Sequence, residues 1–205
     1  MQLHPHFLFN TLNTIYNLIP VNAQHAQIMT ARLGHLLRVS LDHHATEKVA
    51  LHHEMDFLME YVEIEKARFE ERLRVEQDIP PETLNAEVPN MILQPLVENA
   101  VRHGISKKAA GGMVKISAHR DNGRLVLMVT NDGLPATHKS STGIGLANTR
   151  ARLTKLYGED FSFNLEPFGT GTRVSLSIPF EVGPDAIREE SQQEPEEVRL
   201  RKAAL

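Results

Sequence analysis

Carboxylate, amide and basic side chains fall together in "LVENAVRHG", residues 96–104, as Glu98, Asn99, Arg102 and His103. A helix would place Asn99 near Arg102 and His103, because residues three and four apart share a face. A neutral amide oxygen suits Mg²⁺, which prefers hard oxygen ligands, and basic side chains suit neighbouring phosphates. An amphipathic helix with a charged face explains the same residues, so this stretch alone leaves both interpretations open.

The tripeptide "NDG", residues 131–133, follows an alternating apolar run that predicts a strand. Gly133 permits an unusual backbone turn. The neighbouring side-chain acceptors, Asn131 and Asp132, could take the amino hydrogens of adenine. The same tripeptide is also an ordinary turn, so on its own this signal is weak.

A candidate anion site lies in "STGIGLAN", residues 141–148. Gly143 and Gly145 allow the backbone to approach a ligand closely. A helix that begins near Ile144 would direct free N–H groups and the positive end of its dipole at an anion. The stretch lacks the third glycine of a dinucleotide fingerprint and the lysine of a P-loop, so neither of those sites is predicted.

Two histidines flank a proline in "LHPHFLFN", residues 3–10. Pro5 suits the first turn of a helix, where its missing N–H has no partner. Apolar residues at helical spacing predict a buried face, made of Leu8, Leu12, Ile15 and Ile19. Polar residues recur on the opposite, accessible face: His6, Asn10, Asn13 and Asn17. Phe7, Leu8 and Phe9 are expected mainly to pack.

The composition narrows the class of protein. The chain has 205 residues, no cysteine and a formal net charge of −4. Disulfides and thiolate metal sites are therefore excluded, and no basic excess indicates nucleic acid. No apolar run reaches the roughly 20 residues of a membrane helix, and no signal peptide is visible. The 11 histidines invite a zinc interpretation, but adjacent histidines on a helix point apart, so solvated polar positions are the default.

Three helices are predicted before about residue 73. The second runs from about 23 to 41, with an inward face of Met29, Leu33, Leu36 and Leu37. The third starts near 51, with one apolar face made of Leu51, Met55, Leu58, Val62 and Phe69, and with glutamates on its other face.

After that point the pattern favours strands. "LRVEQDIPP" predicts a strand, and residues 88–105 predict a buried helix that is begun by Pro89 and Asn90 and closed by Gly104. Two hairpins follow, turning at 121–123 and 169–171, with a helix between them. The predicted fold is α+β: a helical segment, then an α/β sandwich with a mostly antiparallel sheet and helices on one face. The expected parts are residues 1–76, 77–182 and a charged, disordered tail, 183–205.

These motifs occur in one order: an Asn-bearing helix, a strand ending in "NDG", a loop, "GIGL" opening a helix, and "GTGT" in a hairpin. The combination resembles the GHKL (Bergerat-type) ATP-binding domain shared by gyrase, Hsp90-type chaperones, histidine kinases and MutL. With "QLHPHFLFNTLN" upstream, the chain resembles the LytS/YehU-like sensor histidine kinases over about residues 2–180.

The resemblance implies a role for each matching residue. His6, directly before "FLFN", is implied as the phosphoacceptor, in an N-terminal dimerisation segment, and His4 is a bystander. Asn99 is implied as the Mg²⁺ ligand, with Arg102 and His103 near the phosphates or ribose. The other positions implied to bind ATP are Asn131, Asp132, Gly133, Gly143, Ile144, Gly145, Leu146 and Thr172.

One departure concerns adenine. Where the family commonly has Asp-x-Gly-x-Gly, this chain has Asn131, Gly133 and Pro135. Asn131 still offers a carbonyl acceptor but no negative charge. Asp132 would take over this role after a small shift.

A second departure concerns the base. Many histidine kinases carry a glutamate directly after the acceptor histidine, whereas Phe7 follows His6 here. Glu98 is the candidate group that orients or activates the histidine. A solvated helix carboxylate is the alternative for Glu98.

The expected function is the core of a two-component sensor histidine kinase. ATP with Mg²⁺ would phosphorylate His6, a lid at residues 134–142 would close over the phosphates, and a response-regulator aspartate would receive the phosphoryl group. A homodimer is expected, because two copies are needed to bury the helices in a bundle.

The expected location is cytoplasmic, with membrane contact only through a sensor segment that precedes this stretch in the full-length parent. The alternatives are an ATP-binding pseudokinase or interaction module, a GHKL-type ATPase, a serine-directed protein kinase and an α/β scaffold without nucleotide.

Overall fold

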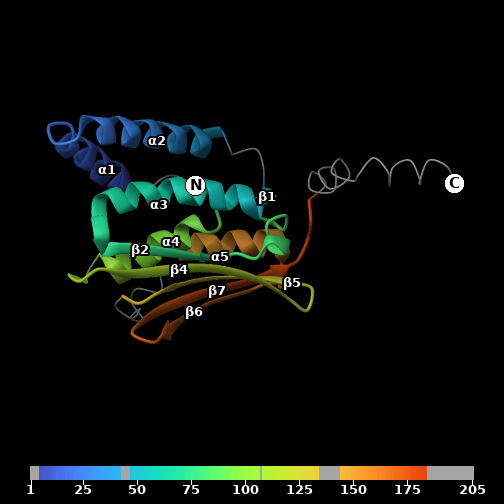
Figure 1. The fold of residues 1–205 in the computed structure, drawn as a ribbon. Coiled ribbons are helices and arrows are strands. Elements are labelled where there is room, and N and C mark those ends of the chain that lie inside the picture. The colour runs from blue at the N-terminus through green and yellow to red at the C-terminus, as the bar shows by residue number, and fades with distance from the viewer. Residues whose placement is uncertain (1–4, 43–46, 107, 134–143, 184–205) are drawn as a thin grey trace, which may run out of the picture.

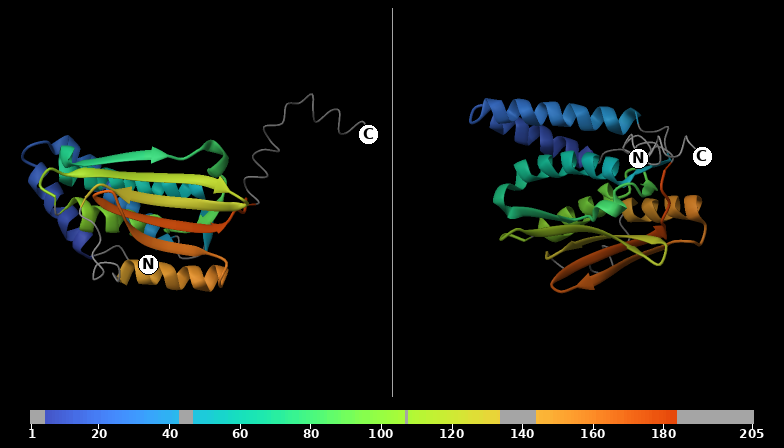
Figure 2. Two further views of the ribbon diagram at one scale, coloured as in Figure 1. Left: turned by 90° about the horizontal axis from the view of Figure 1, so that it is seen from below. Right: turned by 45° about the vertical axis from the view of Figure 1, so that its right-hand side comes forward.

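The computed structural model of the chain describes residues 5–42, 47–106, 108–133 and 144–183. Its α-helices are α1 (Pro5–Leu18), α2 (Ala23–Asp42), α3 (Leu51–Phe69), α4 (Gln94–Asn99) and α5 (Ile144–Tyr157). They lie in layers over one face of a sheet: α4 and α5 next to it, α3 above them, and the α1–α2 hairpin outermost (Figure 1). The right-hand view of Figure 2 shows the same layers, so helices on one face are confirmed.

The main sheet has five strands in the order β2-β4-β5-β7-β6. Their bounds are β2 (Leu73–Asp78), β4 (Gly112–Asp121), β5 (Arg124–Asn131), β6 (Ser162–Phe168) and β7 (Gly171–Pro179). β2 runs parallel to β4, and the other three pairings are antiparallel, which confirms the prediction. Alternate residues of β4, β5 and β7 are buried, because one face of the sheet packs under the helices.

Both predicted hairpins are present. The β4–β5 turn has positive φ at Asn122 (47°) and Gly123 (77°), the conformation that tight two-residue hairpins favour. β6 and β7 pair from Ser162 with Ser177 to Phe168 with Gly171. A smaller ladder joins β1 (Lys48–Ala50) to β3 (Glu87–Pro89), and short 3-10 helices η1 (Glu70–Arg72) and η2 (Pro81–Thr83) complete the connections.

The buried face of α1 differs from the prediction. Ile15 is buried and Leu8 partly buried, as predicted, but Leu12 and Ile19 are exposed, and Phe7 and Thr11 are buried instead. The helix carries apolar residues around more than half of its circumference, and α2 and α3 cover only part of it. Phe9, which was expected to pack, is exposed. The large apolar side chains exposed on the hairpin are Phe9, Leu12, Tyr16, Ile19, Val21 and Ile28; we call these six the apolar hairpin face. The inward residues predicted for α2 are confirmed, with Leu37 partly buried.

The apolar face predicted for α3 is confirmed in full. The glutamates of this helix are not all solvated, however, because Glu54 and Glu65 are among its buried residues. Glu54 and Glu65 lie beside the apolar stripe at helical spacing. Their side chains are therefore buried where α3 packs against α4 and the loop before α4. The helix therefore carries buried carboxylates into the core.

The single helix predicted from Pro89 to Gly104 was wrong at its start. Pro89 ends β3, Met91 has a positive φ of 55°, and α4 begins only at Gln94. The side chain of Glu54 accepts hydrogen bonds from the backbone N–H groups of Met91 and Leu93, and these bonds keep the stretch from forming a helix. After α4 the chain continues as a wider π-helical turn, η3 (Ala100–Ile105).

The predicted three-part division of the chain stays a prediction. Its first boundary, between residues 76 and 77, falls inside β2, which pairs with β4 over its whole length. Residues 184–205 of the predicted tail and the predicted lid lie outside the described residues. Within the described ranges, no helix is both long and apolar enough to span a bilayer.

Candidate functional site

Asn131, the candidate adenine acceptor, ends β5 with 7% of its surface exposed. Its side-chain Oδ1 accepts the backbone N–H of Gly133 at 3.0 Å. A Cβ at Gly104 would meet this Oδ1 at 2.4 Å, and a Cβ at Gly171 would meet the Asn131 carbonyl oxygen at 1.9 Å. Only glycines fit there, so Gly104 of η3 and Gly171 of β7 close a tight backbone pocket around the amide.

Asp132 makes structural contacts of its own. Its Oδ1 accepts the N–H of Met113 in β4 at 2.6 Å, and its backbone N–H donates to the Met113 oxygen. Lys108 and Thr170 donate to its backbone oxygen. The carboxylate thus secures the end of β5 to β4, which makes it a poor replacement for Asn131 as the adenine acceptor.

The predicted ATP residues of β7 and α5 are partly described. Thr172 is buried and pairs with Asn131 in the β5–β7 register. Gly145 lies in the first turn of α5, where a Cβ would stand 4.0 Å from Pro95 of α4. Leu146 is buried in the core, so its side chain packs and does not face a ligand. Gly143 and the side chain of Ile144 lie outside the described residues.

The α4 region presents the other predicted ligands. Asn99 ends α4 and is half-buried, and Arg102 is exposed. The His103 side chain lies outside the described residues. Glu98 is half-buried and accepts a hydrogen bond from Gln94 Nε2 at 2.8 Å, so it is not a freely solvated carboxylate.

A second carboxylate lies near Glu98. Glu65 of α3 is 2% exposed, and burial raises its pKa to about 7, with the charge of Glu98 adding to the rise and that of Arg68 opposing it. An Arg68 nitrogen lies 2.6 Å from Glu65 Oε2, but the angles are those of an ion pair and not of a hydrogen bond. Burial, followed by the charges of Glu65 and Glu98, also holds the pKa of Tyr61 well above its usual range.

His6 lies in α1, and its side chain lies outside the described residues. The following residue, Phe7, packs its ring against Tyr61, with centroids 5.0 Å apart. Tyr61 in turn interacts with both Glu65 and Glu98. Tyr61 therefore interacts both with the residue that follows the predicted phosphoacceptor and with the predicted activating carboxylate.

Glu54 and Arg152 are residues that the motifs did not identify. Glu54 is buried against the chain entering α4, and Arg152 of α5 donates to the backbone oxygens of Asn90 and Glu47. One signal for Glu54 was available: it lies three residues after Leu51 and four before Leu58, hence beside the apolar stripe. No comparable signal marks Arg152.

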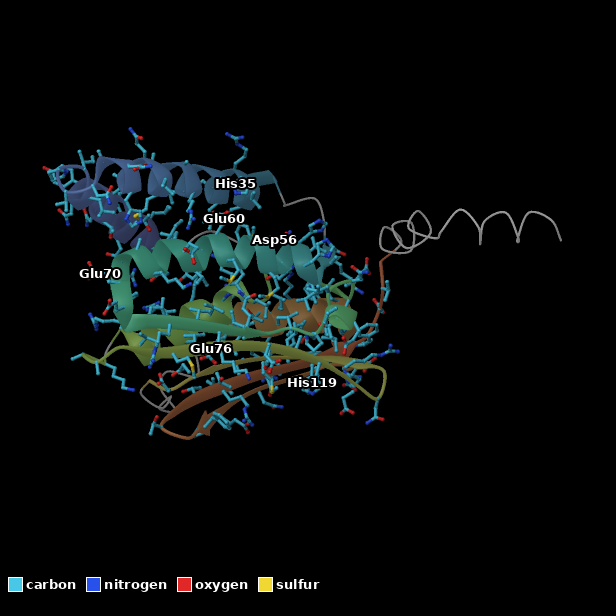
Figure 3. All side chains as sticks on the ribbon, viewed as in Figure 1. His35, Asp56, Glu60, Glu70, Glu76 and His119 are labelled. Atoms are coloured by element: carbon cyan, nitrogen blue, oxygen red, sulfur yellow. The ribbon has the colours of Figure 1, made fainter. Side chains whose placement is uncertain are left out.

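A cavity of about 290 Å³ lies elsewhere, between α2, α3, β1 and the loop after β3. It is lined by His35, Val39, Val49, His53, Asp56, Phe57, Glu60 and Asn90. Figure 3 shows three of these, His35, Asp56 and Glu60, where α2 faces α3. None of the predicted site residues lines it. Among the described residues, no group of three or more histidines and carboxylates could hold a metal ion.

Two family profiles match the chain. One, described as "Histidine kinase", covers residues 1–73, and the other, described as "Histidine kinase-, DNA gyrase B-, and HSP90-like ATPase", covers residues 85–182. Sensor histidine kinase BtsS of Escherichia coli (strain K12) is 37% identical over 182 residues, which are 87% of this chain and 32% of BtsS. Sensor protein LytS of Oceanobacillus iheyensis is 30% identical over 194 residues, 87% of this chain and 33% of LytS. The chain thus spans about a third of the length of these relatives.

Solved structures show the same fold. The histidine kinase domain of the Erythrobacter litoralis EL346 blue-light activated histidine kinase superposes with a TM-score of 0.52 at 16% identity, over 85% of this chain and 93% of that one. The Acinetobacter baumannii histidine kinase AdeS gives 0.52 at 14% identity, over 85% and 95%. At such identities the likeness shows the fold alone.

The fold and the second profile match together define a GHKL-type domain preceded by a helical hairpin, as the sequence predicts. The matches to both halves, in order, fix the family. The chain belongs to the LytS/YehU-like sensor histidine kinases.

Proposed function

We propose that this chain is the catalytic core of a sensor histidine kinase, which phosphorylates His6 from ATP and passes the group to a response-regulator aspartate. The observation that carries the proposal is the buried Asn131 acceptor, enclosed by Gly104 and Gly171 beside α4. A half-buried amide at Asn99 lies on the same side of the sheet. These groups have the chemistry to bind a purine at one end of the site and a metal-bound phosphate at the other.

The residues present fit ATP with Mg²⁺. Asn131 would accept from the adenine amino group, and the first turn of α5 at Gly145 would donate N–H groups to phosphate. Asn99 would hold the metal ion, which supplies charge neutralisation on the phosphates when bound. Most of the catalysis is then positioning, because phosphoryl transfer asks little covalent chemistry of the protein.

Transfer requires a neutral ring nitrogen on His6. A nitrogen–phosphorus bond forms as the bond from the γ-phosphorus to the ADP oxygen breaks, and ADP leaves with that electron pair. The proton on the other ring nitrogen is then lost. Glu98 is the proposed group that orients the ring or takes this proton, because Glu98 and α1 both approach Tyr61.

Two copies of the chain are proposed to act together. The apolar hairpin face is exposed in one copy, and a second copy would bury it in a helical bundle. The parent protein is proposed to be held at the cytoplasmic face of a membrane by a segment outside this chain. No nucleic-acid partner is proposed.

The decisive experiment is incubation of the protein with γ-labelled ATP and Mg²⁺. We expect a label that is stable in base and labile in acid, lost in His6→Gln and retained in His4→Gln. Acid-labile label in His6→Gln would show that another residue is the acceptor. Nucleotide binding without any label would support the pseudokinase, and ATP turnover that is indifferent to His6 would support an ATPase.

A further inference from the structure

Glu54, in the first turn of α3, is 1% exposed, and its carboxylate is fully engaged with another part of the chain. Its Oε2 accepts the backbone N–H of Met91 at 2.7 Å, and its Oε1 accepts that of Leu93 at 2.8 Å. Each of the two side-chain oxygens therefore has its own backbone donor. These two fix the last residues before α4 begins at Gln94.

The same short stretch is held from its other side. Arg152 of α5 donates through Nη1 to the backbone oxygen of Asn90, and through Nη2 to that of Glu47 at 3.1 Å. The charges of Arg152 and Glu54 also attract each other. Residues 90–93 are thus clamped between α3 and α5, and their positive-φ turn at Met91 is kept in place.

The clamped stretch leads directly into α4, and both α4 and α5 carry proposed nucleotide ligands. α4 runs from Gln94 to Asn99, and α5 starts with Gly145 in its first turn. α3 also contacts the hairpin, through the Phe7–Tyr61 ring contact and the Arg32–Glu63 ion pair at 3.2 Å. Figure 1 shows α3 between the hairpin and the α4–α5 layer. Glu54 is therefore placed where a movement of α3 reaches the start of α4.

We propose that Glu54 is a positioning residue that sets the place of α4, and through it of the Asn99 amide, relative to α3. The proposal rests on the proposed function, since it concerns how Asn99 meets a metal-bound phosphate. A shift of α3 would move the carboxylate and, with it, the start of α4. Asn131, the proposed adenine acceptor, lies against Gly104, Gly133 and Gly171, and Glu54 makes none of these contacts.

The test compares wild type with Glu54→Gln. Glutamine keeps the shape of glutamate but offers one acceptor and an NH₂ group, so one of the two buried N–H groups would face another donor. We expect amide hydrogen exchange at residues 91–99 to quicken about tenfold without nucleotide, the size set by an unsatisfied buried group. The increase in ATP affinity that Mg²⁺ causes should fall about tenfold, while adenosine affinity stays within about twofold.

Val62→Ala is the matched control. Val62 is buried on the same helix, so its truncation lowers stability but leaves the Glu54 hydrogen bonds in place. It should leave the Mg²⁺ effect unchanged. Arg152→Gln is a second variant, for use if Glu54→Gln does not fold. Arg152 is half-buried and holds the same stretch from the side of α5, so we expect a smaller shift in the same direction.

The outcomes separate this inference from the proposed function. Wild type that binds no nucleotide contradicts the proposed function, and the exchange at residues 91–99 still decides the role of Glu54. Normal exchange and a normal Mg²⁺ effect in folded Glu54→Gln would overturn the inference, while His6 labelling could remain. A loss of the Mg²⁺ effect of the same size in Val62→Ala would also overturn it, because general destabilisation would then explain the result.

Discussion

The side-chain oxygen of Asn131 accepts the backbone N–H of Gly133 at 3.0 Å, at the buried end of β5. The proposed adenine acceptor therefore also shapes the chain that follows it. An amide has a single oxygen for both tasks, whereas a carboxylate would have two. The asparagine thus limits how strongly the adenine amino group can be bound.

Asn131→Asp should tighten ATP binding about threefold to tenfold, because a charged acceptor makes a stronger hydrogen bond than a neutral one. One carboxylate oxygen could keep the Gly133 N–H while the other meets adenine. Calorimetric titration with ATP and Mg²⁺ measures the change. Asn164→Asp, on exposed β6, adds the same charge elsewhere and should have no effect. Equal or weaker binding by Asn131→Asp would remove Asn131 from the adenine site.

Gly104→Ala should displace the Asn131 amide, because the new Cβ would stand 2.4 Å from Oδ1 and 2.8 Å from Cγ. We expect at least tenfold weaker ATP binding and lower stability, measured by titration and by urea unfolding. Gly34→Ala is the control: nothing lies within 4 Å of its Cβ in α2, and stability should rise by about 0.5–1 kcal/mol.

A double variant locates the clash of Gly104→Ala. In Gly104→Ala/Asn131→Ala the new Cβ has no amide to displace, so the double variant should be less destabilised than the sum of the two single changes. Simple additivity of the two unfolding free energies would place the clash elsewhere.

Burial raises the pKa of Glu65 to about 7 from an ordinary 4.5, so the folded state holds its proton over a range where the unfolded chain has lost it. Between pH about 4.5 and 7 the folded state binds more protons, and stability must fall as pH rises. Burial also raises the pKa of Glu54 to about 7, although backbone N–H groups and Arg152 oppose the shift. The titration of Glu54 therefore changes stability in the same direction.

Glu65→Gln isolates this contribution. Glu65 interacts with three groups: Arg68 and Tyr61 on α3, and Glu98 on α4. The substitution leaves all three in place. Since glutamine mimics the protonated form, the variant should gain stability relative to wild type as pH rises from 5 to 8, by at most about 1.4 kcal/mol per pH unit. Parallel urea-midpoint curves across this range would contradict the shifted titration.

The order of elements, the antiparallel hairpins and the apolar face of α3 all follow from short-range patterns, and the structure confirms them. The late start of α4 does not. Pro89 and Asn90 are good helix-starting residues, but the Met91 N–H donates to the carboxylate of Glu54, which lies 37 residues earlier in the chain. A long-range hydrogen bond of this kind overrides local propensity and leaves no periodic signal.

The face of α1 shows a different limit. Leu12, Ile15 and Ile19 belong to one apolar stripe by spacing, yet only Ile15 of these three packs inward, beside Phe7 and Thr11. When apolar residues cover most of a helix, spacing alone does not tell which side the neighbouring helices cover. Asn131 and Gly133 are different again, because their side-chain-to-backbone contact is local and their motif could be read directly from the sequence.

Charge on the apolar hairpin face should dissolve the proposed homodimer. Leu12 and Tyr16 are 53% and 74% exposed in one copy, so Leu12→Glu and Tyr16→Glu should leave that copy folded. In a dimer each change would bury a carboxylate in both copies, and we expect at least a hundredfold weaker association. Light scattering from micromolar to millimolar protein measures it, with Asn17→Glu, exposed on the same helix, as the charge control. A wild-type monomer throughout, or dimers that survive both changes, would exclude this face as the interface.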